Sequence, residues 1–247
     1  DAVWGVTYSP DGITIATASI DSTVKLWDFN FENLMMEGCD WLENYFLNQS
    51  PELLIELEIC QNTSLTKKIA PRLVARGKER AREGHSREAI DLLKQALEWD
   101  SSLDFSPHQT AQASALVAEG VMLAQAGDIS PAVEKFTKAN QLDKGSISAT
   151  DWDHLCWNGG IHNQASEVLF ACEKAVALAP KNVIIIDSRG LAYALTGKTK
   201  EAIADFKIFV NSTIPSEEGR AQRQRWITAL EKGENPMTPR ELESLRE

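Results

Sequence analysis

The sequence lacks any apolar run of the roughly 18 to 20 residues that would cross a bilayer, and no basic-then-apolar signal opens it. Cysteine is scarce: there are four, without C-x-x-C spacing. Because their neighbours are apolar, we expect reduced, buried thiols and a cytoplasmic, reducing compartment. Basic residues are fewer than acidic ones: the 25 Lys and Arg and the 36 Asp and Glu give a net charge of −11. Nucleic acid needs a basic face and is therefore not an expected partner.

Local signatures of catalysis are missing as well. No G-x-S-x-G motif occurs, and the histidines are spread over separate units: His85, His108, His154 and His162. A zinc site can be imagined from the group Asp151, Asp153, His154, Cys156 and His162. However, no second Cys/His pair has the spacing of structural zinc. We therefore expect no enzyme activity, no metal and no cofactor.

One segment, Ala192–Thr199, satisfies a relaxed P-loop pattern in which Ala replaces the first Gly. A P-loop needs a strand before it and a glycine-rich loop whose amides surround the phosphates. Here a helical pattern precedes the segment, and Gly197 is its only glycine. A turn between two helices is the favoured interpretation. An NTP-binding or enzymatic unit is the alternative, and loss of nucleotide binding on Lys198→Ala would support it.

The most regular stretch is Ile186–Phe209, which predicts two short helices separated by a turn at Gly197. Small residues fall where two antiparallel helices approach closely, and aromatic residues fill the gaps: Gly190, Tyr193, Ala202 and Phe206. A single hairpin cannot bury its own apolar face, so a recurrence of the pattern is informative.

The pattern recurs upstream in three further units. Its members are Trp152, Leu155, Cys156, Ala175 and Pro180; Leu116, Gly120, Leu123, Gly127, Ala132, Phe136 and Ala139; and Leu73, Gly77, Gly84, Ala89, Leu93 and Ala96. This resembles the tetratricopeptide repeat (TPR) family, whose unit is a helix–turn–helix of about 34 residues. The resemblance covers roughly residues 72–210, with a lengthened connection near residues 101–108. The third unit departs from the pattern at Gly159, where a large residue is usual, and at Val168, where a small one is usual.

Residues 1–29 differ from the rest. Alternating apolar and polar residues, interrupted by turns at Pro10–Gly12 and at Asp21, predict three short strands. The segments SPDG and SIDSTVKLWD resemble a WD-repeat blade of a β-propeller, in which Asp21 and Trp27 are structural residues. Because a propeller needs several blades, this resemblance implies further blades upstream and a chain that is a fragment.

The predicted fold is mainly α: a TPR solenoid of about four units with a capping helix, preceded by one antiparallel blade and a helical bridge. The four expected segments are the blade at 1–29, the bridge at 30–68, the solenoid at 69–214, and the capping helix with its tail at 215–247. In the bridge, the aromatic stripe of Trp41, Tyr45 and Phe46 favours core, and residues 51–60 predict one helix. The last residues, RELESLRE, predict a short frayed helix.

The remaining expected function is binding. Stacked repeats form a concave groove lined by the first helix of each unit. The resemblance assigns the groove side chains to Val74, Lys78, Ser114, Val117, Val121, Asp153, Trp157, Asp187 and Leu191. Some relatives clamp a terminal carboxylate with Lys, Asn and Arg, which are absent at Val117, Val121, Asp153 and Asp187. We expect an apolar or basic helix or extended peptide instead. The groove could also be filled by the chain's own segments.

The order of blade and solenoid resembles the C-terminal part of bacterial WD-repeat–TPR signalling proteins with a STAND or caspase-like effector. This implies a non-catalytic scaffold or sensor that binds a protein or peptide partner, beside upstream propeller blades and an effector domain. The other alternative is a structural spacer, which a self-filled groove would favour.

Overall fold

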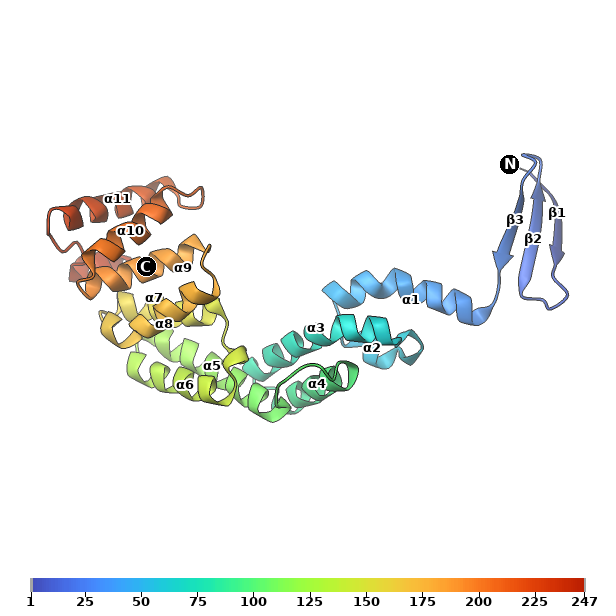
Figure 1. Ribbon diagram of the computed structural model, residues 1–247, viewed down its shortest axis with the longest axis horizontal. Helices are drawn as coiled ribbons and strands as arrows, with labels where there is room; N and C mark the ends of the chain where they lie inside the picture. Colours follow the sequence, from blue (N-terminus) through green and yellow to red (C-terminus); the bar gives the residue numbers. More distant parts are fainter. Residues whose placement is uncertain (1, 247) are drawn as a thin grey trace. The chain divides into compact units, whose positions relative to one another are not determined.

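The computed structural model describes residues 2–246, which form two compact units (Figure 1). Of the described residues, the first contains 2–77 together with 91–104, and the second contains 78–90 and 105–246. Each unit is described by itself below. The four-segment division expected from the sequence stays a prediction.

The first unit begins with a three-stranded antiparallel sheet in the order β1-β2-β3. The strands are β1 (Val3–Tyr8), β2 (Thr14–Ser19) and β3 (Val24–Asp28). The backbone and hydroxyl of Thr23 donate to the Asp21 carboxylate, which fixes the second turn, and Trp27 Nε1 donates to Thr17 Oγ1 at 2.9 Å. The predicted strands and the structural roles of Asp21 and Trp27 are confirmed. The sheet by itself leaves large side chains in the open, with Trp4 76% exposed.

Three helical segments follow: α1 (Phe31–Asn48), α2 (Leu53–Glu56) and the 3₁₀ turn η1 (Glu58–Cys60). The prediction of one helix over residues 51–60 is wrong, because the backbone leaves the helical region at Leu57. The prediction of an aromatic core stripe holds for Phe46 but not for Trp41 and Tyr45, which are 78% and 47% exposed. Cys39 and Phe46 define the buried face of α1. Trp41, two positions beyond Cys39, lies about 200° around the helix from that face.

The remaining helices form successive helix–turn–helix pairs. They are α3 (Thr63–Arg82) and α4 (Ser86–Trp99), α5 (Pro107–Ala126) and α6 (Ile129–Leu142), α7 (Ala149–Ile161) and α8 (Ala165–Leu178), and α9 (Val183–Leu195) and α10 (Thr199–Val210). The 3₁₀ turn η2 (Lys144–Ser146) precedes α7, and α11 (Glu217–Glu231) and α12 (Pro239–Ser244) follow the pairs. Helices α7, α9 and α11 begin 34 residues apart. From α5 onward each pair packs on the next (Figure 1), so the predicted helical-repeat fold is confirmed.

In each helix pair of the second unit, the two helices approach closely at a pair of residues 16 positions apart. We call this the closing contact. In α5–α6 and α9–α10 a glycine on the first helix faces a phenylalanine on the second. A methyl group on Gly190 would lie 2.9 Å from Phe206 Cε1, and one on Gly120 would lie 2.8 Å from Phe136 Cδ2. In α7–α8 the same two positions are Cys156 and Cys172, which form a disulfide across a Cα–Cα distance of 4.9 Å.

The prediction of reduced thiols is therefore wrong. A second disulfide joins Cys39 of α1 to Cys60 of η1, and no cysteine is free among the described residues. The sequence does not indicate this pairing, because cysteines 16 or 21 residues apart match no metal or redox motif. A helix hairpin nevertheless brings such positions together. Disulfides persist in oxidising environments and are rare in the cytosol. Because these cysteines are paired, they give no support for a reducing, cytoplasmic compartment.

The two departures of the third unit compensate each other. A Cβ on Gly159 would fall within 3.0 Å of the Val168 side chain. In the following pair the equivalent positions are Tyr193 and Ala202. The large and small partners have thus exchanged helices, which keeps the spacing between the helices. The apparent defect in the repeat is a reciprocal substitution.

The C-terminal segment is docked, so the expectation of a frayed tail is also wrong. Met237 and Leu242 are buried in an apolar cluster that includes Leu191, Phe206 and Trp226. Within residues 2–246, no helix is both long and apolar enough to cross a membrane.

The closing contact predicts that Gly190→Ala destabilises the chain by about 1–3 kcal/mol, because the new methyl group overlaps a fully buried ring. The matched control is Gly38→Ala in α1, where a Cβ meets nothing within 4 Å. The control should be neutral or gain up to about 1 kcal/mol from helix propensity. Urea unfolding followed by circular dichroism measures both. Equal stabilities of the two variants would contradict the assigned contact.

Candidate partner-binding face

The predicted binding residues lie on the first helices of the pairs, on α3, α5, α7 and α9. We call the side of α5, α7 and α9 that carries these positions, together with the side of α11 that continues it, the first-helix face. Four of the nine predicted residues are buried and cannot meet a partner in this conformation: Ser114, Val117, Asp187 and Leu191. The other five are partly exposed: Val74, Lys78, Val121, Asp153 and Trp157.

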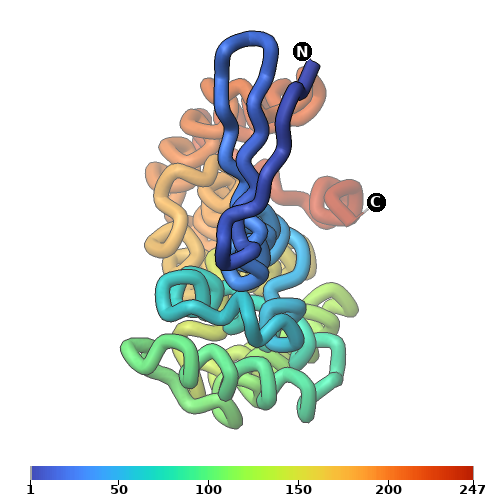
Figure 2. Tube along the Cα trace, turned by 90° about the vertical axis from the view of Figure 1, so that its right-hand side faces the viewer, coloured from blue at the N-terminus to red at the C-terminus, as the bar shows by residue number. Residues whose placement is uncertain are grey.

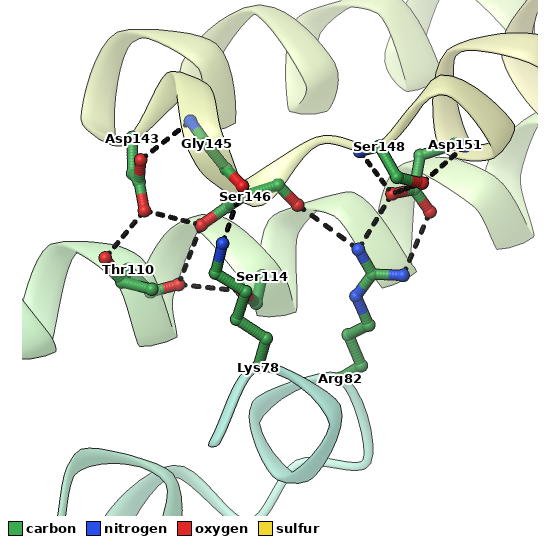
Figure 3. Close-up of polar contacts among 9 residues, drawn as sticks. All are labelled: Lys78, Arg82, Thr110, Ser114, Asp143, Gly145, Ser146, Ser148 and Asp151. Carbon is green, nitrogen blue, oxygen red and sulfur yellow. Dashed lines mark hydrogen bonds and ion pairs between the residues drawn. The ribbon is translucent and has the colours of Figure 1, made fainter. Parts of the chain in front are cut away.

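Lys78 belongs to a polar network that ties the end of α3 to the connection between α6 and α7 (Figure 3). Its Nζ donates to the Gly145 carbonyl at 2.6 Å. One turn later, Arg82 donates to both carboxylate oxygens of Asp151, at 2.9 and 2.8 Å, and to the Ser146 carbonyl. Lys78 is therefore already engaged by the chain's own backbone.

Two carboxylates hold this connection in shape. Asp143 accepts from Thr110, Gly145 and Ser146, and Asp151 accepts from both the backbone and the hydroxyl of Ser148 (Figure 3). Burial disfavours the charged form of each carboxylate. The hydrogen bonds outweigh that effect and hold both pKa values below the ordinary value. The network is thus a charged structural joint that stays ionised at neutral pH.

The buried predicted residues serve the fold. Ser114 donates to the Thr110 carbonyl one turn back, and Val117 and Leu191 belong to the apolar clusters. Asp187 is closed off by Arg223 of α11, whose Nη2 lies 2.6 Å from Asp187 Oδ2 and whose Nε lies 3.1 Å from Oδ1. The side chains of this ion pair are 5% and 9% exposed, which leaves Asp187 no room for a ligand.

Asp153 occupies the same position as Asp187 one repeat earlier, yet it is not closed. Its repeat-equivalent arginine is Arg189, 34 residues before Arg223. Arg189 instead forms a two-bond ion pair with Asp205 of α10, with both N–O distances 2.8 Å. Sixteen positions after Arg223, where Asp205 stands relative to Arg189, the residue is Pro239 and not a carboxylate. Asp205 therefore takes the cation that Asp153 lacks.

The electrostatics of Asp153 reflect this arrangement. Burial raises its pKa to about 6, a hydrogen bond with Ser188 and the nearby His154 oppose the shift, and Asp187 adds to it. Among the described residues, its Oδ1 atom is buried and has no hydrogen-bond partner. An unpartnered buried polar atom is unfavourable, so this carboxylate is poised to accept a donor.

Two other partly exposed members of the predicted set are apolar. Trp157 lies one turn further along α7 and packs, half-buried, against the cluster that contains Ile161 and Leu191. Val121 of α5 packs, also half-buried, against the other cluster. The reachable part of the predicted set within the second unit thus combines one acidic group with two apolar ones.

The P-loop-like segment adopts the geometry of an inter-helix turn. Ala192–Leu195 ends α9, Gly197 has φ +77°, and α10 begins at Thr199. Lys198 lies over the Tyr193 ring at 5.1 Å and within 3.7 Å of the Glu173 carboxylate. A helix and not a strand precedes the turn, so the context that phosphate binding requires is missing here. In residues 2–246, no three His, Cys, Asp or Glu side chains gather as metal ligands would.

Comparisons with known proteins bear on both parts of the chain. Residues 1–28 match the family model of the WD domain, G-beta repeat. Among solved structures, the crystal structure of the P58(IPK) TPR domain is similar, with 16% identity and a TM-score of 0.45. The match covers 82% of this chain and 56% of that one, so this chain spans little more than half of that structure's length. No curated protein matches the chain.

The repeat assignment depends on the helix pairs and their 34-residue period. The chain combines one WD repeat with an array of TPR-like helix pairs. Repeats of these two kinds are in general protein-interaction modules and typically not enzymes.

The sequence interpretation missed three functional features: Arg223 as the partner of Asp187, Arg189 as the partner of Asp205, and the docked tail. Aligning the repeats would have exposed the first, because Asp153 and Arg189 lie one period before Asp187 and Arg223. Nothing in the sequence indicates that Asp205 diverts Arg189.

The raised pKa makes a prediction about stability. Asp153 titrates near 6 in the folded chain and near 3.8 when unfolded, so between these pH values the folded chain binds more protons. Raising the pH through this window therefore destabilises the wild type relative to Asp153→Asn. At pH 7.5 the variant should be more stable by about 3 kcal/mol, and below pH 4 the difference should vanish. Urea unfolding across pH measures it, with Asp128→Asn, an exposed carboxylate, as control. A pH-independent difference would contradict the assignment.

Proposed function

We propose that the chain is a non-catalytic protein-interaction module whose first-helix face binds a partner segment that carries a basic side chain beside an apolar one. The basic group would pair with Asp153, and the apolar group would pack on Trp157 and Val121. The observation that carries this proposal is Asp153, a partly exposed residue whose carboxylate has one oxygen without a hydrogen-bond partner among the described residues.

The next repeat supports the chemistry of the occupant. At the equivalent position, Asp187 receives a guanidinium from Arg223, which also lies over the Trp226 ring at 4.6 Å. A carboxylate, a guanidinium and an aromatic ring thus already assemble once on this face. Asp153 and Trp157 offer the first and last of these, so an arginine or lysine from a partner would complete the set.

The charge of the chain favours the same partner. With a net charge of −11, it attracts basic segments over long range and repels acidic ones. A peptide with Arg or Lys next to a large apolar residue is attracted by the negative net charge and also matches the groups around Asp153. The role of scaffold or sensor in a larger bacterial signalling protein and its upstream effector are further proposals that rest on the resemblance of the sequence alone.

A random dodecapeptide phage library selected on the full chain tests the proposal. We expect enriched sequences to share a basic residue next to a large apolar one. The best synthetic peptide should lose about 10-fold or more in affinity on Asp153→Asn, because a charge-assisted hydrogen bond contributes about 1.5–3 kcal/mol. Trp157→Ala should weaken it too. The control Asp128→Asn removes one exposed carboxylate from the α5–α6 turn and should leave the affinity unchanged.

The pH profile distinguishes pairing with Asp153 from general attraction. Because the carboxylate form binds the cation, affinity should rise between pH 5 and pH 7 in the wild type and stay flat in Asp153→Asn. Enriched peptides without a basic residue, or equal affinities for Asp153→Asn and Asp128→Asn, would reject the proposed site and leave the spacer as the better hypothesis.

A further inference from the structure

The C-terminal tail is a short helix that carries its own start signal. Thr238 caps α12 by accepting from the Glu241 backbone N–H, and Pro239 occupies the first turn. The segment can therefore form its single turn locally. Its apolar side chains are Met237 and Leu242, at 6% and 3% exposure, with Leu245 partly buried beside them.

The surface below the tail offers matching polar groups. Trp226 Nε1 and Gln222 Nε2, both from α11, donate to Glu241 Oε1 at 2.7 and 2.9 Å. Arg246 donates twice to the carbonyl of Ile161, the last residue of α7, at 2.6 and 3.0 Å. Carbonyls at a helix C-terminus lack intrahelical partners and favour a cation. Glutamate and arginine are thus each recognised by a specific group.

The tail is lightly held. Helix α12 has only six residues and follows α11 at the end of a loop (Figure 2). That loop contains Gly233 at φ +81° and Pro236, which separate it from α11. A pocket of about 310 Å³ remains where Asn163 faces Met237, Leu242 and Arg246. Two buried apolar side chains and a few hydrogen bonds are a small anchor, so another segment of the same kind could replace it.

We propose that the surface of Ile161, Gln222 and Trp226 is a docking site for a short amphipathic helix of a partner protein, and that α12 occupies this site in cis. The tail defines the ligand: a Met-x-x-x-Glu-Leu-x-x-Leu-Arg segment, with the glutamate at the indole and amide N–H groups and the arginine at the end of α7. This site differs from Asp153 in residues and in ligand, because it selects an acidic group at the start of a helix.

The occupant controls access to the site. A tethered segment competes at an effective concentration in the millimolar range, so a partner of similar affinity binds only when the tail is released or outnumbered. The tail therefore acts as an internal competitor that raises the threshold for binding.

A fluorescein-labelled peptide of residues 235–246 is the probe, and the full-length chain is the receptor. The double variant Leu242→Ala/Arg246→Ala removes one buried side chain and the α7 contact, so the tail should undock. We expect the peptide to bind this variant at least about 10-fold more tightly than the wild type. The single variant Glu241→Gln, which weakens the contact to Trp226 and Gln222, should fall between them.

The matched control is Arg240→Ala, an exposed position of the same helix, which should behave as the wild type. A probe that itself carries the Leu242 and Arg246 substitutions should not bind. Unchanged circular dichroism shows that the receptor stays folded. Equal binding to wild type and double variant, or binding of the substituted probe, would overturn the proposal. So would a wild-type dimer in sedimentation that the probe dissociates, because the ligand would then be the tail of a second copy.

Discussion

The arrangement of the second unit depends on how closely the two helices of each pair approach one another. That approach is set at one position on the first helix, where the residue must be small or covalently bonded to the second helix. Gly120 and Gly190 admit a phenylalanine ring, and Cys156 is joined to Cys172. A larger residue would separate the helices and shift every side chain that follows.

The same contact places the candidate binding residues. Asp153 and Asp187 each lie three positions before the closing residue of their pair, so the fold presents both carboxylates in the same way. Of the two, only Asp187 is paired with an arginine, and this difference follows from the presence of Asp205 on α10. Asp205 in the last pair draws Arg189 away, whereas the corresponding position after Arg223 is Pro239, which has no carboxylate to compete. One carboxylate is sealed by Arg223, and the other keeps an unpartnered oxygen.

Much of the fold was predictable because it is periodic. Glycine and aromatic residues recurring with a fixed spacing indicate helix pairs, and SIDSTVKLWD indicates the strands of the blade. The disulfides were not predictable in this way, since a cysteine can replace glycine at a closing contact without changing the pattern. Burial of Ser114 and Val117 was missed because a family position gives the helix face but not the depth. The tail was misjudged because its charged sequence conceals specific partners for Glu241 and Arg246.

The state of the Asp153 carboxyl in the free and bound chain tests the account most directly. Carboxyl carbon-13 NMR, assigned through Asp153→Asn, reports its pKa without reference to stability. The account predicts a value near 6 in the free chain, and a fall when a peptide with a basic residue beside an apolar one is added. A value near 3.8 in the free chain, or one that the bound peptide leaves unchanged, would contradict the account.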